Sequence, residues 1–119
     1  MAKLIYNEKV ILENMKFATS TKDISLGLMF STKKKARKGL CMVMPSDKDV
    51  RYGASITMLF VFFSLEILFI NSEMRVVDKV LLKPWMPSYT PREECRYVIE
   101  SVKGKFKEIN IGDKVSIVK

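Results

Sequence analysis

Residues 56–70 form the longest apolar stretch of the sequence, and Glu66 stands near its middle. The stretch is shorter than the roughly 20 apolar residues that a membrane-spanning helix needs, and the carboxylate would make insertion costlier still. Its Phe, Val and Ile residues favour buried strands over a helix. We therefore predict two strands, Met58–Phe63 and Leu65–Ile70, at the centre of the fold.

Further strands are predicted on both sides of this stretch. Asn71-Ser72-Glu73 is a turn signal that should return the chain into a strand over Met74–Leu82. A turn at Glu13-Asn14 should separate two short strands near the N-terminus. Apolar runs bounded by turn residues predict the remaining strands, which are Val10–Leu12, Met15–Ala18, Leu40–Met44, Tyr97–Val102 and Lys114–Val118.

Helical signals are confined to short segments. The Ser20-Thr21 pair can cap a helix that ends near Phe30. Thr90-Pro91 is a good start for a single helical turn over Arg92–Cys95, although a continuous helix over Pro91–Lys103 competes with this interpretation.

Two segments should be irregular. Lys33–Lys38 carries five cations in six residues, and their mutual repulsion predicts an exposed loop. Three prolines, at positions 84, 87 and 91, force an irregular loop that carries Trp85 and Tyr89. Short strands with one or two short helices predict a mainly β fold. We expect one domain over residues 1–119, a compact antiparallel β-barrel or sandwich.

Composition excludes several kinds of chemistry. The sequence contains no histidine, so it cannot form a Ser-His-Asp triad, a Cys-His pair, a His-ligated zinc site or an imidazole general base. Cys41 and Cys95 stand far apart and outside any Cys-x-x-Cys motif, which favours two reduced, buried thiols over a single disulfide. We expect neither a metal site nor a cofactor.

Charge and residue usage bear on partners and location. The sequence has 21 Lys and Arg residues against 13 Asp and Glu residues, which gives a formal net charge of +8. The N-terminal residues lack the apolar core of a secretory signal, so we expect a cytoplasmic protein. Abundant lysine and the absence of glutamine are typical of thermophile proteins.

Six short segments occur in an order and spacing that chance rarely produces: Leu26-Gly27-Leu28-Met29-Phe30, Gly39-Leu40-Cys41-Met42-Val43-Met44-Pro45, Leu65-Glu66-Ile67-Leu68-Phe69, Val77-Asp78, Cys95-Arg96-Tyr97-Val98-Ile99-Glu100 and Ile111-Gly112-Asp113. Together they resemble domain-of-unknown-function family 192, an uncharacterised protein family, in its archaeal type. The resemblance covers most of the chain from about Thr19 onward. It implies a small β-barrel-like or jelly-roll-like fold and no established biochemical activity.

The chain departs from this family at a few positions. Members often carry a Trp-Met-x-Asn-Thr segment before a Leu-Asp strand, whereas this chain has Ser55–Phe60 there and lacks both the Trp and the Asn. Any chemistry that the segment performs in other members would then be absent. Glu66 replaces the usual Asp, and Cys95 replaces the usual Ala.

Glu66 is the most unusual candidate residue, because an isolated carboxylate in an apolar strand is costly to bury unless it is paired or hydrogen-bonded. It could transfer protons or anchor a polar ligand, or it could accept backbone N–H groups or pair with Arg96. Asp78 and Glu100, which match family positions, could complete a carboxylate pair. Asp113 follows a glycine and is better explained as a turn residue.

Cations and aromatic residues supply two further groups of candidates. Five cations could bind phosphate backbones: Lys33, Lys34, Lys35, Arg37 and Lys38. No aromatic residue is interleaved with them, so the stacking that single-stranded nucleic acid needs has no support in the sequence, and a solvated segment is the plainer interpretation. Trp85 and Tyr89 could stack on a sugar or base at the mouth of a barrel, or they could pack on prolines to seal its end.

The leading hypothesis is a non-catalytic binding module that holds a polar or anionic ligand, or a partner protein, at one end of a small β-barrel. The loop around Trp85 would form the ligand mouth, with Glu66 and Arg96 as polar anchors. One alternative is a hydrolase that uses paired carboxylates. Another is an RNA-binding protein that uses the basic segment, and its affinity would fall steeply with salt.

Overall fold

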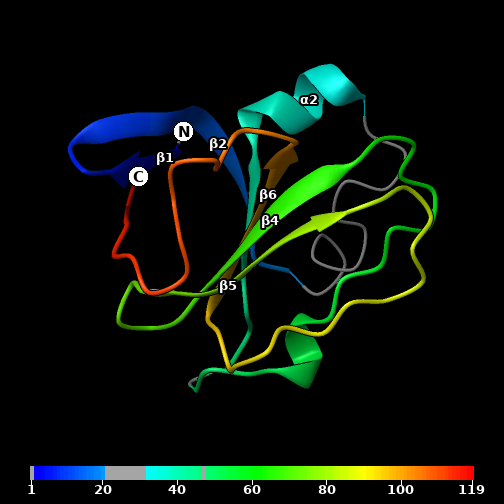
Figure 1. Cartoon of the computed structure of the whole chain (residues 1–119). Helices are drawn as coiled ribbons and strands as arrows, with labels where there is room; N and C mark the ends of the chain where they lie inside the picture. Colours follow the sequence, from blue (N-terminus) through cyan, green and yellow to red (C-terminus); the bar gives the residue numbers. More distant parts are fainter. Residues whose placement is uncertain (1, 21–31, 47) are drawn as a thin grey trace.

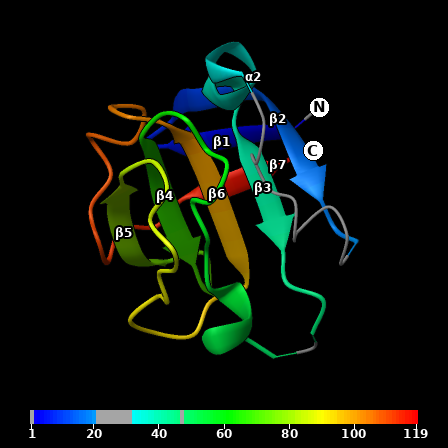
Figure 2. The same cartoon turned by 90° about the vertical axis from the view of Figure 1, so that its right-hand side faces the viewer.

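The computed structural model describes residues 2–20, 32–46 and 48–119. In this part of the chain, seven strands form a sheet in the order β5-β4-β6-β3-β2-β1-β7 (Figures 1 and 2). The strands are β1 (Ala2–Tyr6), β2 (Lys9–Ala18), β3 (Leu40–Val43), β4 (Leu65–Ile70), β5 (Val76–Leu82), β6 (Tyr97–Val102) and β7 (Ser116–Val118). The short helices described are α2 (Lys33–Lys38) and the 3-10 helix η1 (Tyr52–Ala54).

The sheet curls into a half-barrel, which confirms the predicted mainly β fold. β2 allows the sheet to curl, because its first part pairs antiparallel with β1 while Lys16–Ala18 pairs parallel with β3. β1 and β7 consequently cross behind the central strands (Figure 2). The β2–β3 pair is the exception to the antiparallel arrangement. These two strands run parallel, since a long connection and not a hairpin joins them.

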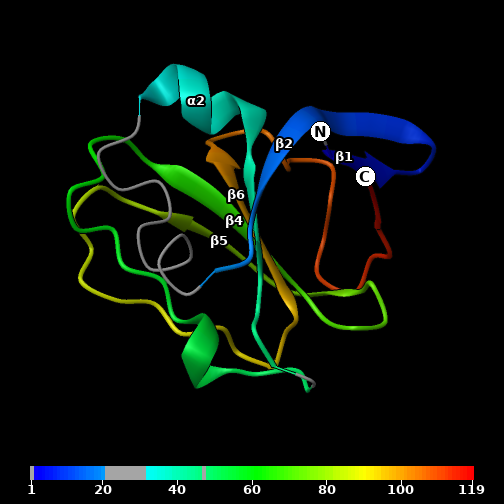
Figure 3. The ribbon, with the colours of Figure 1, turned by 180° about the vertical axis from the view of Figure 1, so that it is seen from behind.

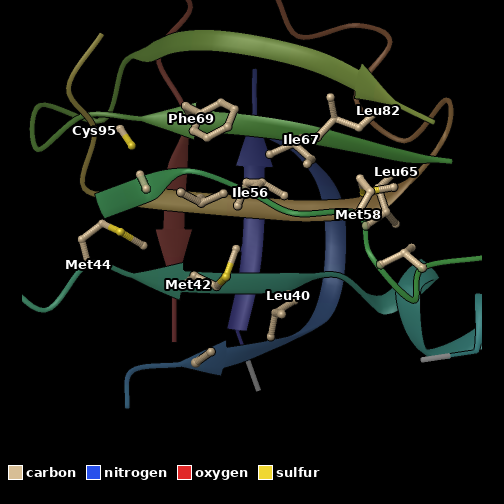
Figure 4. Close-up of a cluster of buried hydrophobic side chains, with 14 of the residues drawn as sticks. Leu40, Met42, Met44, Ile56, Met58, Leu65, Ile67, Phe69, Leu82 and Cys95 are labelled. Carbon is tan, nitrogen blue, oxygen red and sulfur yellow. The ribbon is translucent and has the colours of Figure 1, made fainter. Parts of the chain in front are cut away.

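Strand β4, which lies between β5 and β6, is buried on both of its faces. Ile67 and Phe69 lie in one hydrophobic core, which we call the loop-covered core (Figure 4), and Leu68 and Ile70 lie in the other, which we call the inner core. All four side chains are 0% exposed. The inner core is completed by side chains of β1 and β2, among them Leu4, so the curl of the sheet encloses it.

The prediction of a strand over Met58–Phe63 is wrong. β4 already pairs with β5 on one edge and with β6 on the other, so it has no edge left for this segment to join. Met58 and Val61 instead bury their side chains in the loop-covered core, and the Met58 N–H donates to the Met86 carbonyl (2.8 Å). The segment therefore covers a face of the sheet and does not extend it (Figure 4).

The prediction of a loop over Lys33–Lys38 is also wrong, because these residues form α2. Thr32 caps the helix by accepting a hydrogen bond from the Lys35 N–H (3.2 Å), and Gly39 ends it with a φ of 87°. Ala36 is the buried residue of the helix, so the cations extend into solvent, where their repulsion is screened. Cations in the last turn also interact favourably with the helix dipole.

The N-terminal chain reversal lies at Asn7 and Glu8 and not at Glu13-Asn14 as predicted. Asn7 and Glu8 both have positive φ, of 50° and 63°. β2 is consequently one long strand where two short ones were expected. Its polar residues Glu13 and Asn14 lie in the part of the strand that pairs with β1, opposite the register shift between Ala2 and Leu4, and this irregularity breaks the simple alternation of apolar and polar residues.

The helical turn predicted over Arg92–Cys95 is wrong, and so is the alternative helix over Pro91–Lys103. Cys95 forms a β-bridge with Val50, and the chain then enters β6. Strands predicted over Leu40–Met44, Leu65–Ile70, Met74–Leu82 and Tyr97–Val102 are confirmed to within two residues. Residues 21–31, which contain most of the predicted helix ending near Phe30, lie outside the described part of the chain.

Leu68→Ala should lower the free energy of unfolding by about 2–5 kcal/mol, because it removes buried methyl groups and leaves a cavity in the inner core. Leu81→Ala is the matched control, since Leu81 lies on the neighbouring strand β5 and is 42% exposed. Chemical denaturation of both variants would measure the difference. Equal losses of stability would contradict the burial of β4 on both faces.

Candidate functional site

The ligand mouth predicted from the sequence is not assembled in the structure. Glu66 is 9% exposed, and its carboxylate accepts hydrogen bonds from the N–H groups of Phe106 (2.5 Å) and Gly104 (3.5 Å). The Arg96 guanidinium donates to the Ser46 carbonyl instead. Glu66 is near the start of β4, whereas the Arg96 N–H donates to the carbonyl of Ile70 at its end. The two residues are therefore separated by about 13 Å along the strand.

Asp78 ties the proline-rich loop to β5. The carboxylate is 1% exposed and accepts hydrogen bonds from the Tyr89 hydroxyl (2.5 Å) and from the N–H groups of Arg92 (3.1 Å) and Lys79 (2.8 Å). Arg92 Nε lies 3.5 Å from Asp78 Oδ1. Burial and the hydrogen bond to Asp78 raise the pKa of Tyr89 to about 12. This network fixes the loop and leaves both Asp78 oxygens occupied.

Glu100 is a buried carboxylate that lacks a full set of partners. It is 3% exposed, and among the described residues no donor reaches its Oε1 atom. In the sheet it pairs with Leu40 on β3 and Ile67 on β4, so its side chain lies on the face of the loop-covered core. Burial raises the pKa of Glu100 to about 7.

The three acids do not form the carboxylate pair that a hydrolase would need. Glu66 pairs with Ser101, the neighbour of Glu100, so Glu66 and Glu100 extend from opposite faces of the sheet. Asp78 lies on β5 and Glu100 on β6, and β4 between them separates the two backbones by about 9.5 Å. The Asp78 carboxylate is also engaged by Tyr89 and Arg92.

The two predicted aromatic candidates point in different directions. Tyr89 turns inward, with its ring centroid 5.9 Å from that of Phe69. Trp85 is 45% exposed, and its ring contacts those of Phe60 (5.0 Å) and Phe62 (5.5 Å) edge to face. Trp85 and Phe60 both have positive φ, of 66° and 60°, which costs on the order of 1 kcal/mol for each non-glycine residue. We call Phe60, Phe62 and Trp85 the aromatic cluster.

Asp113 holds the last turn of the chain. Its carboxylate accepts hydrogen bonds from the Asn110 N–H (2.8 Å) and the Tyr6 hydroxyl (2.8 Å). The bond from the Asn110 backbone is the main cause that lowers the pKa of Asp113. These contacts agree with its interpretation as a turn residue.

The predicted cations Lys33, Lys34, Lys35, Arg37 and Lys38 are all exposed on α2. The Ser101 hydroxyl fixes this helix over the end of β6 by donating to the Ala36 carbonyl (2.8 Å). A groove of about 430 Å³, which we call the basic groove, lies beside the helix. It is lined by Lys33, Arg37, Ser64, Val102 and Lys103.

A second groove of about 370 Å³ shares Arg37 with the basic groove and also contains Lys38 and Lys105. In the part of the chain that the structure describes, ion pairs join Lys9 to Glu108 and Arg92 to Asp78, and none involves a cation of the two grooves. Sequence reasoning missed Lys103 and Lys105, although both follow directly on the end of a predicted strand.

The described residues contain no group of three or more Cys, Asp or Glu side chains that could hold a metal ion. Cys41 and Cys95 are free and buried, and burial raises the pKa of each thiol to about 12. Protonated, buried thiols are poor nucleophiles. Within the described ranges, no helix is long and apolar enough to cross a membrane.

The family model DUF192, described as an uncharacterized ACR, matches residues 5–117. The chain belongs to this family. The UPF0127 protein of Pyrococcus horikoshii is 40% identical over 93 residues, which are 76% of this chain and 76% of the relative. The UPF0127 protein of Pyrococcus furiosus is 33% identical over 109 residues, 90% of this chain and 89% of the relative. Such archaeal thermophile relatives agree with the residue usage of the sequence.

The DUF192 fold is also found in a crystal structure of a protein of unknown function from Novosphingobium aromaticivorans. The two structures superpose with a TM-score of 0.81, and the match covers 97% of this chain and 82% of the other at 19% sequence identity. This likeness concerns the fold. The family and these relatives carry no described activity, so function has to be argued from the site.

Glu100→Gln should flatten the pH dependence of stability. Because the pKa of Glu100 is raised from 4.5 to about 7, the folded protein keeps this proton between those values while the unfolded chain loses it. Stability should therefore fall as the pH rises through this window and level off above it, a total loss on the order of 3 kcal/mol. Denaturant titrations of both proteins at pH 5 and pH 8 would measure it. An equal fall in the variant would rule out Glu100 as the source.

Glu66→Gln should lower the free energy of unfolding by about 1–3 kcal/mol, because the amide supplies one acceptor oxygen where the carboxylate supplies two. Glu94→Gln changes an exposed glutamate and is the control. Thermal and chemical unfolding would both report the difference. If Glu66→Gln left stability unchanged but abolished ligand binding, Glu66 would be a binding residue and not a structural one.

Proposed function

We propose that this protein is a non-catalytic binding module for a phosphate-bearing anion, and that the anion binds in the basic groove. The observation that carries this proposal is the convergence of Lys33 and Arg37 from α2 with Lys103 from the end of β6. Segments distant in sequence thus place three positive charges around one concave surface.

Electrostatics supports an anionic ligand. No described carboxylate pairs with these cations, so they repel one another until a counter-charge enters the groove. The guanidinium of Arg37 suits bidentate contact with phosphate oxygens, and the Ser64 hydroxyl can donate a further hydrogen bond. The formal net charge of +8 would also speed the approach of an anion.

The lining of the basic groove favours binding over catalysis. It consists of three cations, one hydroxyl residue and Val102, and so provides no carboxylate or thiol as an acid, base or nucleophile. The buried acids Glu66 and Asp78 are committed to hydrogen bonds elsewhere. The proposed ligand is still an anion, as the sequence predicted, but its site is the basic groove and not a mouth formed by the loop around Trp85.

Inorganic pyrophosphate is a suitable first probe, and calorimetric titration would measure its affinity. The double variant Arg37→Ala, Lys103→Ala should bind pyrophosphate at least about tenfold more weakly, since each charge-assisted hydrogen bond contributes about 1.5–3 kcal/mol. The double variant Lys48→Ala, Lys114→Ala removes the same charge from exposed positions outside both grooves, and it should bind within about twofold of the wild type.

Two results would overturn the proposal. One is the absence of pyrophosphate binding by the wild-type protein at low salt. The other is an equal loss of affinity in both double variants, which would assign the binding to net charge and not to the groove.

A further inference from the structure

The aromatic cluster lies beside the basic groove, although the two are separate in the sequence. Ser64 lines the groove, and Phe62 precedes it by two residues, so their Cα atoms are within about 7 Å of each other. The Trp85 ring lies 5.5 Å from that of Phe62. Ser64 lines the groove together with Lys33 and Arg37, and in two perpendicular views the segment leading into β4 passes close to α2 (Figures 2 and 3).

The exposed rings are held in place by buried neighbours. Phe62 is 60% exposed and Trp85 is 45% exposed. The backbone N–H of Trp85 donates to the Met58 carbonyl (3.0 Å), and Met58 is 0% exposed. The backbone of Trp85 is thus fixed to the loop-covered core, and the exposed Phe62 ring packs against the Trp85 ring.

We infer that the anion of the basic groove is single-stranded nucleic acid, whose bases stack on Phe62 and Trp85 while its phosphates contact Lys33, Arg37 and Lys103. This inference rests on the proposed function and names its ligand class. Binding of a single strand requires two features, a cationic groove and exposed aromatic rings. The groove binds the negatively charged phosphates, and the rings stack on the bases, each of which has a π face.

The second groove extends the same track. Arg37 belongs to both grooves, and Lys105 follows Lys103 after one intervening glycine. A backbone that leaves the basic groove past Arg37 enters the second groove, whose lining adds Lys38 and Lys105 and also one acidic residue, Glu13. The cations of the two adjoining grooves together suit a chain of several phosphates better than a single phosphate group.

The shape of the surface favours a strand over other anionic partners. A lipid surface is flat and cannot follow a concave groove, whereas a single strand can lie along it. An acidic peptide would neutralise the cations but has no need for exposed aromatic rings. The segment Lys33–Lys38 contains no aromatic residue, and for this reason the sequence offered little support for nucleic-acid binding. In the fold, the rings of Phe62 and Trp85 supply the aromatic surfaces from other segments.

Trp85 is the one tryptophan of the sequence, so its fluorescence reports directly on the aromatic cluster. A short oligouridylate should quench this fluorescence on binding, whereas pyrophosphate and an abasic oligonucleotide of equal length should bind without quenching. The logarithm of the oligouridylate affinity should fall with the logarithm of salt concentration by about 0.7 for each phosphate contacted.

Phe62→Ala and Trp85→Ala should each weaken oligouridylate binding by about fivefold to about a hundredfold in an anisotropy titration, and leave pyrophosphate binding unchanged. Tyr52→Ala is the matched control, because Tyr52 is 75% exposed and η1 lies at the other end of the molecule from α2 (Figure 1). Circular dichroism and the unfolding midpoint would verify that each variant is folded, and Trp85→Phe should retain most of the binding.

The outcomes separate this inference from the proposed function. Equal affinity for oligouridylate and the abasic strand, with no effect of the aromatic variants, would overturn the inference and leave the anion site intact. Binding of neither pyrophosphate nor oligouridylate would overturn both. Binding of phosphatidylserine vesicles that depends on Phe62 and Trp85, without quenching by oligouridylate, would assign the surface to a membrane and also overturn the inference.

Discussion

The six residues of β4 are all buried, and the strand is hydrogen-bonded along both edges. With both edges occupied, the preceding apolar residues cannot add another strand, so they fold over one face of the sheet and close the loop-covered core. With both faces apolar, the sheet needs a second cover, which the curl through β2 supplies by bringing β1 and β7 over the inner core. The aromatic cluster is exposed as a consequence of this cover over the sheet, because the covering segment buries Met58 and Val61 and turns Phe62 outward.

The polar residues at one end of the sheet build the walls of the basic groove. Glu66 and Ser101 are cross-strand partners on β4 and β6. The Ser101 hydroxyl holds α2 through the Ala36 carbonyl, while the Glu66 carboxylate holds the Gly104 and Phe106 amides that follow Lys103. Cations on α2 and after β6 thereby acquire a fixed separation. The Glu66 carboxylate, for which the sequence left open a ligand anchor or an acceptor of backbone N–H groups, accepts backbone N–H groups and so positions the segment that follows Lys103.

How far sequence reasoning reached depended on whether a signal was local. The turn at residues 71–73 and the strands around it follow from alternation and turn chemistry, which act within a few residues. The segment Lys33–Lys38 was misassigned because its repulsion was weighed without Thr32, Gly39 and the burial of Ala36, which together favour a helix. Of the two kinds of partner predicted for Glu66, backbone N–H groups are the ones that bind it, and the register of β4 places Arg96 at the opposite end of the strand.

The sequence by itself determined the mainly β class, the family, the exclusion of histidine chemistry and the excess of positive charge, because composition and short motifs are properties of the chain. Only the tertiary structure decided which charges share a surface. Lys33, Arg37 and Lys103 meet because β3 pairs with β6 and Ser101 anchors α2, and Phe62 joins them because β4 has no free edge. Such long-range pairing depends on burying both faces of one strand at once, a condition that no local pattern encodes.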